Sequence, residues 1–293
     1  MRIAAWNLNH RTKEKTISLM ALCGIKSVNA DILVLTEYVD GPSRLEFKRS
    51  LADMGYGHIS ISRRITIHNQ VLIASKSEQI TGDIAAPDFT DAAKTNFLHC
   101  IFPRHGFELV GVRPPSYKSV SDRILYWQQL SKIMSSVASR PIIFVGDLNC
   151  DPFGKNTPGS TSLKDLMKLG YNIPNPMGAW SYISSNGNSS SRIDHAVASS
   201  SFGKCATSYI CEEGSSIFAG IASKNPVSDH AILVVDCDCA RARGTWGQGD
   251  ILYSTCQVKM IFPLNHMVAF FSELRTYFSL GFSCGEFLTN GES

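Results

Sequence analysis

The sequence predicts an α/β protein, in which short buried strands alternate with amphipathic helices. Residues 142–145 are four apolar residues in a row, too few for a helix and rich in β-branched and aromatic side chains. Residues 32–36 form a second such run, as expected for a strand that is covered on both faces. Residues 122–138 carry apolar side chains at helical spacing. Sheets with helices packed on them fit these patterns.

The composition is that of a globular protein. Of the 293 residues, 44% are hydrophobic and 18% are charged, which argues against a disordered chain. The nine cysteines are odd in number and scattered, which favours a reducing compartment. No apolar run approaches the roughly 18 residues of a membrane span, and no secretory leader precedes the first predicted strand. We therefore expect a cytoplasmic protein that is monomeric and has no membrane span.

The predicted elements follow one another closely along the chain. In the first half, the strands are residues 2–6, 32–36, 58–62 and 71–75, and the helices are residues 14–29 and 42–54. Residues 77–95 show no period and are predicted to be irregular. In the second half, the strands are residues 96–102, 107–112, 142–145, 196–198, 205–211 and 231–235, and the helices are residues 122–138 and 162–169. The polar segment 184–191 is predicted to be a mobile loop.

The character of the sequence changes after Cys239. A basic, glycine-containing join spans residues 240–249, and the apolar residues that follow it show no clean period. We therefore expect one domain over residues 1–239 and a loosely ordered C-terminal extension over residues 240–293.

Polar side chains stand at the ends of several predicted strands. They are Asn7, Glu37, Asp147, Asn149, Asp194, Asp229 and His230. Strand ends of one sheet system converge on a shared edge, where α/β proteins place their chemistry. Carboxylates and amides without a thiolate suit a hard cation such as Mg²⁺ or Mn²⁺, and a histidine beside a carboxylate suits proton transfer. Taken singly, each residue also fits a simpler role as a turn former or a structural side chain.

Five of these segments carry a resemblance to a known family. They are Ala5-Trp6-Asn7, Leu35-Thr36-Glu37, Gly146-Asp147-Leu148-Asn149, Arg192-Ile193-Asp194 and Ser228-Asp229-His230. In this order they resemble the endonuclease/exonuclease/phosphatase superfamily over about residues 1–238. The resemblance implies a four-layer α/β sandwich of the DNase-like type, with two mixed β-sheets packed face to face and helices outside.

The resemblance also implies roles for these residues. Glu37 would be the principal metal ligand, with Asn7 close by and Asp229 near the metal. Catalysis would fall to the remaining strand-end residues, and these are Asp147, Asn149, Asp194 and His230. Asp147 would position or activate the attacking water, and Asn149 would hold a phosphate oxygen. His230 would contact the scissile phosphate or transfer a proton, and Asp194 would orient it.

The sequence departs from the family pattern at two positions. Asn9 stands where many of the nucleases carry an acid, which weakens a second metal site. Arg113 stands where a tyrosine or histidine is frequent, and it would bind a phosphate oxygen without donating a proton at neutral pH. Two further residues are predicted to bind substrate: Ser181, which lies between two aromatic residues in a segment placed near the phosphate in the family, and Asn69, before a strand.

The activity expected from the resemblance is a Mg²⁺-dependent phosphoesterase, with nucleic acid as the expected substrate. A net charge of +3 permits a phosphate-bearing partner but is small for tight duplex binding. The arginines expected to line a phosphate-binding face are Arg63, Arg64, Arg104, Arg113 and Arg192. Two alternatives remain open: a phosphatase or phosphodiesterase of a small phosphorylated metabolite or lipid headgroup, and a binding protein without catalysis on a nuclease fold.

Overall fold

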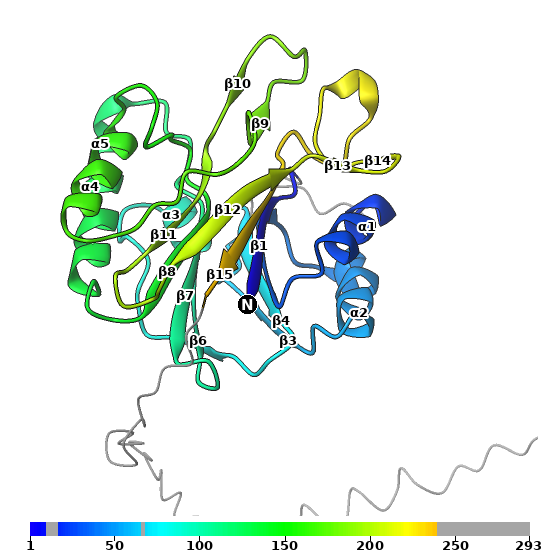
Figure 1. Ribbon diagram of the computed structural model, residues 1–293, viewed down its shortest axis with the longest axis horizontal. Coiled ribbons are helices and arrows are strands. Elements are labelled where there is room, and N and C mark those ends of the chain that lie inside the picture. The colour runs from blue at the N-terminus through cyan, green and yellow to red at the C-terminus, as the bar shows by residue number, and fades with distance from the viewer. Residues whose placement is uncertain (10–16, 66–67, 239–293) are drawn as a thin grey trace, which may run out of the picture. The chain divides into compact units, whose positions relative to one another are not determined.

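The computed structural model describes residues 1–9, 17–65 and 68–238, which contain two β-sheets and their flanking helices (Figure 1). In order across the first sheet, the strands are β12 (Cys205–Ile210), β15 (Ile232–Cys237), β1 (Arg2–Asn7), β2 (Ile32–Tyr38), β4 (Gln70–Ser75) and β3 (His58–Ile61). Across the second sheet they are β11 (Asp194–Ala198), β8 (Ile142–Asp147), β7 (Phe107–Val112), β6 (Phe97–Phe102) and β5 (Ile80–Thr81). Two small hairpins, β9 (Tyr182–Ile183) with β10 (Ser190–Ser191) and β13 (Glu212–Glu213) with β14 (Ser216–Ile217), complete the strands.

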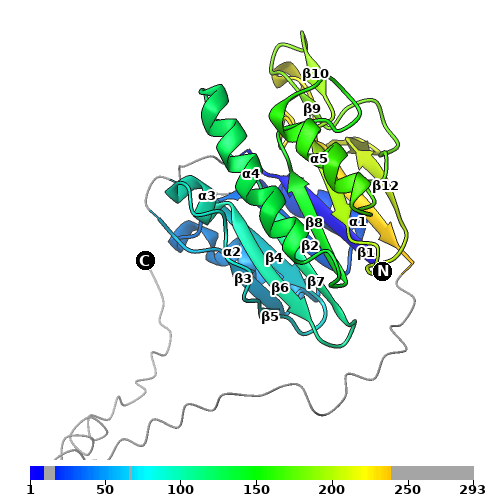
Figure 2. The ribbon, with the colours of Figure 1, turned by 90° about the vertical axis from the view of Figure 1, so that its left-hand side faces the viewer.

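The two sheets pack face to face, and helices cover their outer faces. The inner core joins apolar residues of both sheets, such as Val34 and Ile73 of the first and Leu109 and Val145 of the second. On the outer face of the first sheet lie α1 (Leu19–Val28) and α2 (Leu45–Asp53). Figure 2 shows α4 (Val120–Ser136) and α5 (Pro158–Lys168) lying over the second sheet. The predicted four-layer α/β sandwich with two mixed sheets is confirmed.

The strand directions bring several chain segments to one edge of this sandwich. In the first sheet β1 and β2 are parallel, and β15 is antiparallel to β1, so β15 begins where β1 ends. In the second sheet β7 and β8 are parallel, and β11 is antiparallel to β8. Asp194 consequently lies directly opposite Asp147 in the register. The polar residues that follow or precede these strands therefore gather at one place in each sheet.

Several element boundaries differ from the sequence prediction. Helix α1 begins at Leu19, because the Ser18 side chain accepts a hydrogen bond from the backbone of Met20 and so caps the helix. The predicted start at residue 14 lies outside the described residues. Helix α5 begins at Pro158 instead of residue 162, because Thr157 forms a capping box and proline suits the first turn.

Two segments predicted to be irregular contain regular structure. Within residues 77–95 the chain forms β5, which pairs with β6, and the short helix α3 (Asp91–Thr95). Within residues 184–191 it forms β10 at Ser190–Ser191, which pairs with β9, so the predicted loop is the turn of a hairpin and its mobility stays a prediction. These three elements are two to five residues long and lack an apolar period, which is why the pattern did not reveal them. Two short 3₁₀-helices, η1 (Pro42–Arg44) and η2 (Ala222–Lys224), complete the elements.

The predicted C-terminal extension, residues 240–293, lies outside the described residues. Among the helices of the described part of the chain, none is both long and apolar enough to cross a membrane.

Candidate active site

The site begins with the turn that ends strand β8. Gly146 has a φ of 147°, and a Cβ atom there would lie 2.3 Å from the carbonyl oxygen of Val112, so only glycine fits. Asn149 follows with a φ of 52°, and its backbone N–H donates to Oδ1 of Asp147 at 3.0 Å. The two polar side chains are therefore brought together by a tight turn.

Glu37 lies in a distorted part of strand β2. Its φ is 50°, and the pairing of β2 with β4 shifts register between Leu35 and Tyr38. A positive φ is uncommon for a residue with a side chain, and such conformations cluster at functional sites. The bulge leaves the glutamate 6% exposed at the inner edge of the sheet. The carboxylate is thus buried instead of emerging into solvent.

Arg113 joins the two sheets at this edge. It follows strand β7, and its Nη2 lies 2.5 Å from Oε1 of Glu37 while its Nε lies 3.4 Å from Oδ2 of Asp147. A guanidinium between two buried carboxylates offsets part of the cost of burying them. Oε2 of Glu37 is buried and has no hydrogen-bond partner among the described residues. The cluster is therefore partly neutralised, with one carboxylate oxygen left over.

Asn7 connects Asp147 with His230. Its Nδ2 donates to Oδ2 of Asp147 at 3.0 Å and lies 3.4 Å from Nε2 of His230. Its Oδ1 accepts the backbone N–H of Asn9 at 2.9 Å, which fixes the orientation of the amide. The asparagine at the end of β1 is therefore a central contact of the cluster.

His230 and Asp194 form the other half of the cluster. Nδ1 of the histidine lies 2.9 Å from Oδ2 of the aspartate, and both side chains are buried. Ser181 is fully buried, and its hydroxyl accepts the backbone N–H groups of Ile193 and Asp194 at 2.8 and 3.1 Å. The serine that was predicted to bind substrate thus holds the backbone of Asp194 in place.

The cluster shifts the acidity of its members. Burial, together with the neighbouring Asp194, raises the pKa of Asp147, although His230 and Arg113 oppose the shift. Burial alone would lower the pKa of His230, but Asp194 and Asp147 outweigh it and raise that pKa to about 9. The arrangement therefore favours a protonated imidazole at neutral pH beside a carboxylate that takes up a proton more readily than usual.

Two predicted residues stand at the margin of the cluster. Asp229 is half-buried next to His230 and lines a cavity of about 340 Å³ together with Asn9 and Tyr182. Asn69 directly precedes β4 at the edge where Gln70 pairs with Tyr38, close in the sheet to Glu37. Its Oδ1 is buried, and no hydrogen bond within the described ranges reaches it.

The predicted phosphate-binding arginines are only partly brought together. Arg63 and Arg64 are exposed after strand β3, which runs parallel to β2, so they lie at the edge of the site. Arg192 precedes β11, donates to Asn175 and lies over the ring of Tyr209. Arg104 lies in the turn between β6 and β7, at the opposite end of β7 from Arg113. Its predicted place on this face is wrong, because the hairpin turn points away from the ends of the parallel strands.

Two supporting residues were not assigned a role from the sequence. The indole N–H of Trp6 donates to the carbonyl of His230 at 2.8 Å, and the hydroxyl of Ser228 donates to the carbonyl of Asn7 at 2.7 Å. Both residues stand within the recognised motifs, so their position in those motifs was the signal. They tie the start of β15 to the end of β1.

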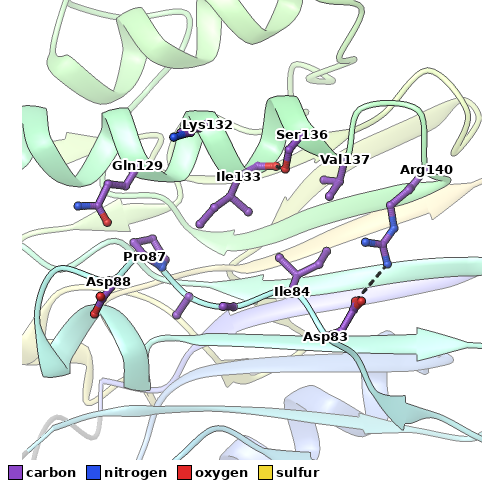
Figure 3. Close-up of a pocket in the computed structure, with 12 residues that line it drawn as sticks. Asp83, Ile84, Pro87, Asp88, Gln129, Lys132, Ile133, Ser136, Val137 and Arg140 are labelled. Carbon is purple, nitrogen blue, oxygen red and sulfur yellow. Dashed lines mark hydrogen bonds and ion pairs between the residues drawn. The ribbon is translucent and has the colours of Figure 1, made fainter. Parts of the chain in front are cut away.

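A groove elsewhere on the domain is unconnected with this cluster. It has a volume of about 590 Å³ and lies between residues 83–88 and helix α4, with Ile84, Ile133 and Val137 on its walls (Figure 3). None of the predicted site residues lines it. The groove therefore has no part in the chemistry expected of those residues.

The donor atoms of the cluster fit a divalent metal ion. Oε2 of Glu37 is an oxygen donor that meets no hydrogen-bond partner in the described part of the chain, and the same is true of Oδ1 of Asp194. Atoms of Asp147, Asp194 and His230 also lie within 4.8 Å of one another, close enough to share an ion. Buried carboxylate oxygens of this kind are the donors that Mg²⁺ and Mn²⁺ prefer.

Comparison with known proteins agrees with the fold and the motifs. The sequence profile of the Endonuclease/Exonuclease/phosphatase family matches residues 4–230, whereas no curated protein matches significantly. An AP endonuclease from Archaeoglobus fulgidus shares 16% sequence identity, with a TM-score of 0.62 over 81% of this chain and 99% of that one. The 3' phosphatase NExo from Neisseria, bound to product DNA hairpin, shares 19%, with a TM-score of 0.61 and coverages of 81% and 99%.

A truncated TDP2 from Caenorhabditis elegans is a third similar structure. It shares 15% sequence identity, with a TM-score of 0.56 over 80% of this chain and 96% of that one. At these identities the structures establish the common fold, and the profile match over most of the chain establishes the family. The chain belongs to the endonuclease/exonuclease/phosphatase family, whose members are metal-dependent hydrolases of phosphoester bonds.

Proposed function

We propose that the protein hydrolyses phosphodiester bonds in nucleic acid, at the cluster between the ends of β1, β2 and β8. One observation carries this proposal. A buried His230–Asp194 pair at 2.9 Å lies beside Asp147, to which Asn7 links it, and Arg113 lies on the other side of Asp147. Proton-transfer groups and a fixed cation thus surround one point, as the hydrolysis of an anionic ester requires.

The chain's own residues have distinct tasks in this reaction. Asp147 orients or deprotonates the attacking water, and a pKa raised by burial suits a base. His230, held by Asp194, donates a hydrogen bond or a proton to an oxygen of the scissile phosphate. Arg113 binds a phosphate oxygen, and so does Asn149 through the second N–H of its Nδ2, since the first is donated to the carbonyl of Pro114. Both contacts stabilise the charge that develops on the phosphate.

The metal ion would be held by Glu37, with Asn7 and Asp229 close by. We favour Glu37 because one of its carboxylate oxygens is buried without a partner among the described residues. The alternative donor set of Asp147, Asp194 and His230 also has one such oxygen, Oδ1 of Asp194, but its other donor atoms are already joined by hydrogen bonds to Asn7 and within the set. Mg²⁺ or Mn²⁺ bound here would supply a Lewis acid that polarises the phosphate.

Nucleic acid is supported by the surroundings of the cluster. Arg63 and Arg64 are exposed at the same sheet edge and would contact phosphates further along a polymer. A similarly folded protein, NExo, was seen with a DNA hairpin. A small phosphorylated metabolite is the second candidate, because the net charge of +3 is small for a protein that binds duplexes tightly. The cytoplasmic location and the monomeric state stay predictions.

The proposal is tested by cleavage of abasic duplex DNA, single-stranded DNA and bis(4-nitrophenyl) phosphate, each with Mg²⁺ and with EDTA. The wild type should cleave DNA with Mg²⁺ and lose that activity with EDTA, and His230→Ala should cleave about 10²–10⁴-fold more slowly. His58→Ala, at an exposed histidine of β3, is the matched control and should retain full activity. Cleavage of the small ester alone would replace nucleic acid by a small phosphoester as the substrate.

The metal ligands are tested separately by titration of the protein with Mg²⁺. Glu37→Gln should weaken the binding of Mg²⁺ more than Asp194→Asn does. The reverse order would assign the ion to the set of Asp147, Asp194 and His230. Both variants are read by heat of binding, so the comparison does not depend on activity.

A further inference from the structure

Two cysteines of the first sheet lie opposite each other on neighbouring strands. Strand β12 begins at Cys205, strand β15 ends at Cys237, and the two residues are partners in the antiparallel register. Their Sγ atoms lie 3.3 Å apart, although the residues are 32 positions apart in the chain. Both thiols are free. The fold thus brings two reduced sulfur atoms into contact, at the end of β15 opposite to His230.

The backbone hydrogen bonds leave the side chains of this pair close together. The N–H of Cys237 donates to the carbonyl of Met1 at 2.9 Å, and its carbonyl accepts the terminal ammonium group of Met1 at 3.1 Å. Both backbone groups of Cys237 therefore face β1, while on the β12 side the N–H of Asp238 donates to the carbonyl of Lys204 at 3.1 Å. Cys205 and Cys237 consequently form a non-hydrogen-bonded pair, in which the Cα atoms of antiparallel strands lie about 4.5 Å apart. A disulfide needs Cα atoms about 4.4–6.8 Å apart, so this pair can be bridged without moving the backbone.

The two side chains share one face of the sheet and differ in exposure. Residues directly opposite each other on antiparallel strands point to the same side, and both cysteines contact the inner core between the sheets. Cys237 is 5% exposed, whereas Cys205 is half-buried and lies on the strand at the edge of the sheet. Cys205 is therefore the more accessible thiol for a small oxidant, and Cys237 is in place to attack the oxidised sulfur.

The segment between the two cysteines includes part of the candidate active site. Asp229 and His230 both belong to it. A covalent bond between Cys205 and Cys237 would close this segment into a loop, and closing a loop restricts the unfolded chain. Oxidation of the pair would therefore stabilise the folded form of the segment that carries His230.

We propose that Cys205 and Cys237 form a reversible disulfide when the protein meets a peroxide. The thiolate of Cys205 attacks one oxygen of hydrogen peroxide, the O–O bond breaks, and the other oxygen leaves as hydroxide and takes up a proton to form water. The thiol of Cys237 then displaces the hydroxyl group from the resulting sulfenic acid, which gives the S–S bond and a second water. Two thiols are oxidised and one peroxide is reduced. Thiol–disulfide exchange with glutathione reverses the reaction.

The test treats the full-length protein with hydrogen peroxide, blocks the remaining thiols and digests the protein with trypsin. Trypsin cleaves after lysine and arginine, which places the two cysteines on separate peptides, residues 205–224 and residues 225–241. Mass spectrometry should find these peptides joined before reduction, and the product should be absent from Cys205→Ser and from Cys237→Ser. Cys211→Ser is the matched control and should keep the product, because Cys211 lies on the same peptide as Cys205 and is likewise half-buried.

Thermal unfolding gives a second readout that does not depend on the digest. Oxidation should raise the melting temperature of the wild type by about 5 °C or more, and dithiothreitol should reverse the rise. Cys205→Ser should show no rise, and Cys211→Ser should show the same rise as the wild type. Neither readout uses catalytic activity, so the inference is independent of the proposed function.

Two results would overturn the disulfide. One is a wild type whose two peptides stay separate in excess peroxide. The other is a product that persists in Cys237→Ser, which would assign the bond to Cys239 on the same peptide, a residue outside the described ranges. A joined pair of peptides without a rise in melting temperature would keep the disulfide and reject its stabilising effect.

Discussion

The two ends of strand β7 carry similar charged clusters that differ in how completely they are paired. At its start, Glu108 is buried, and its Oε1 accepts a hydrogen bond from Nε of Arg140 at 2.8 Å. Its Oε2 contacts Nη2 of the same arginine and also lies 2.8 Å from Nε2 of His99. At its end, Arg113 contacts Glu37, whose Oε2 has no partner in the described ranges. Complete pairing is what stability requires, and a buried group without a partner needs another explanation.

The histidines of the two clusters differ in the same way. In His99 both ring nitrogens are engaged, because Nδ1 accepts the backbone N–H of Ile84 at 3.1 Å and Nε2 faces Glu108. In His230, as far as the described residues go, only Nδ1 has a short contact, to Asp194, and Nε2 lies 3.4 Å from Nδ2 of Asn7. A histidine that keeps one nitrogen loosely engaged can still interact with a substrate. The comparison indicates that residue types do not distinguish a structural cluster from a functional site, whereas buried polar atoms with incomplete hydrogen bonding do.

Replacing the histidine of each cluster by alanine should separate the two clusters most clearly. His230→Ala is expected to lower kcat/KM for phosphodiester cleavage by about 10²–10⁴-fold, because it removes the proton-transfer group, with a small change in the melting temperature. His99→Ala should lower the melting temperature and leave the kcat/KM of the folded protein close to that of the wild type. Kinetics and thermal unfolding of both variants check this, and a catalytic loss in the His99 variant alone would reverse the assignment.

Removing the cation between the carboxylates should have the next largest effect. Arg113→Ala is expected to lower kcat/KM about 10- to 100-fold, because it removes a charged contact to the phosphate. The same change should strengthen Mg²⁺ binding, since Glu37 and Asp147 lose a competing positive charge. Calorimetric titration of Mg²⁺ measures the second effect.

Arg113→Lys is the matched control, because it keeps the charge and loses the planar fork. Its Mg²⁺ affinity should stay near that of the wild type while its kcat/KM falls. Weaker Mg²⁺ binding by the alanine variant would show that the arginine supports the metal site instead of competing with it.

Substitutions in the cluster of Glu108, Arg140 and His99 should change the stability of the protein and leave its activity unchanged. Glu108→Ala is expected to lower the free energy of unfolding by about 2 kcal/mol, because Arg140 and His99 lose a buried hydrogen-bonded carboxylate. Asp83→Ala removes an exposed carboxylate that faces Arg140 and His99 at longer distances, and it should change the free energy of unfolding by less than about 0.5 kcal/mol. Urea unfolding measures both, and a loss of activity in the folded Glu108 variant would contradict a purely structural role.

The smallest effect is the pH dependence of that stability. Burial would raise the pKa of Glu108, but its bonds to His99 and Arg140 outweigh it and lower the pKa below the ordinary 4.5. A carboxyl with a lowered folded-state pKa contributes stability above its unfolded pKa and loses it as the pH falls through the folded value. The difference in unfolding free energy between wild type and Glu108→Gln should therefore be constant near neutral pH and shrink below about pH 4.5. A difference that grows on acidification would reject the ion pair.

Much of the domain could be predicted from the chain alone. Apolar runs such as residues 142–145 are buried strands because their side chains must leave water whatever their neighbours are. A polar residue that flanks such a run marks the edge of the sheet, which is why Glu37, Asp147 and His230 were predicted to belong to the site. Short elements such as β5 and β10 were not predicted, because they form by pairing with a neighbouring strand and have no apolar period in the sequence.

The sequence by itself thus determined the alternation of strands and helices, the family motifs and the residue types gathered at one edge. Only the tertiary structure decided how they meet. The antiparallel pairing of β11 with β8 sets Asp194 opposite Asp147, and the packing of the sheets brings Arg113 onto Glu37. The left-handed turn at Asn149 is likewise fastened to a distant segment, through the hydrogen bond from its Nδ2 to the carbonyl of Pro114. Burial is a property of single residues and short runs, whereas pairing is a property of residues that only the fold makes neighbours.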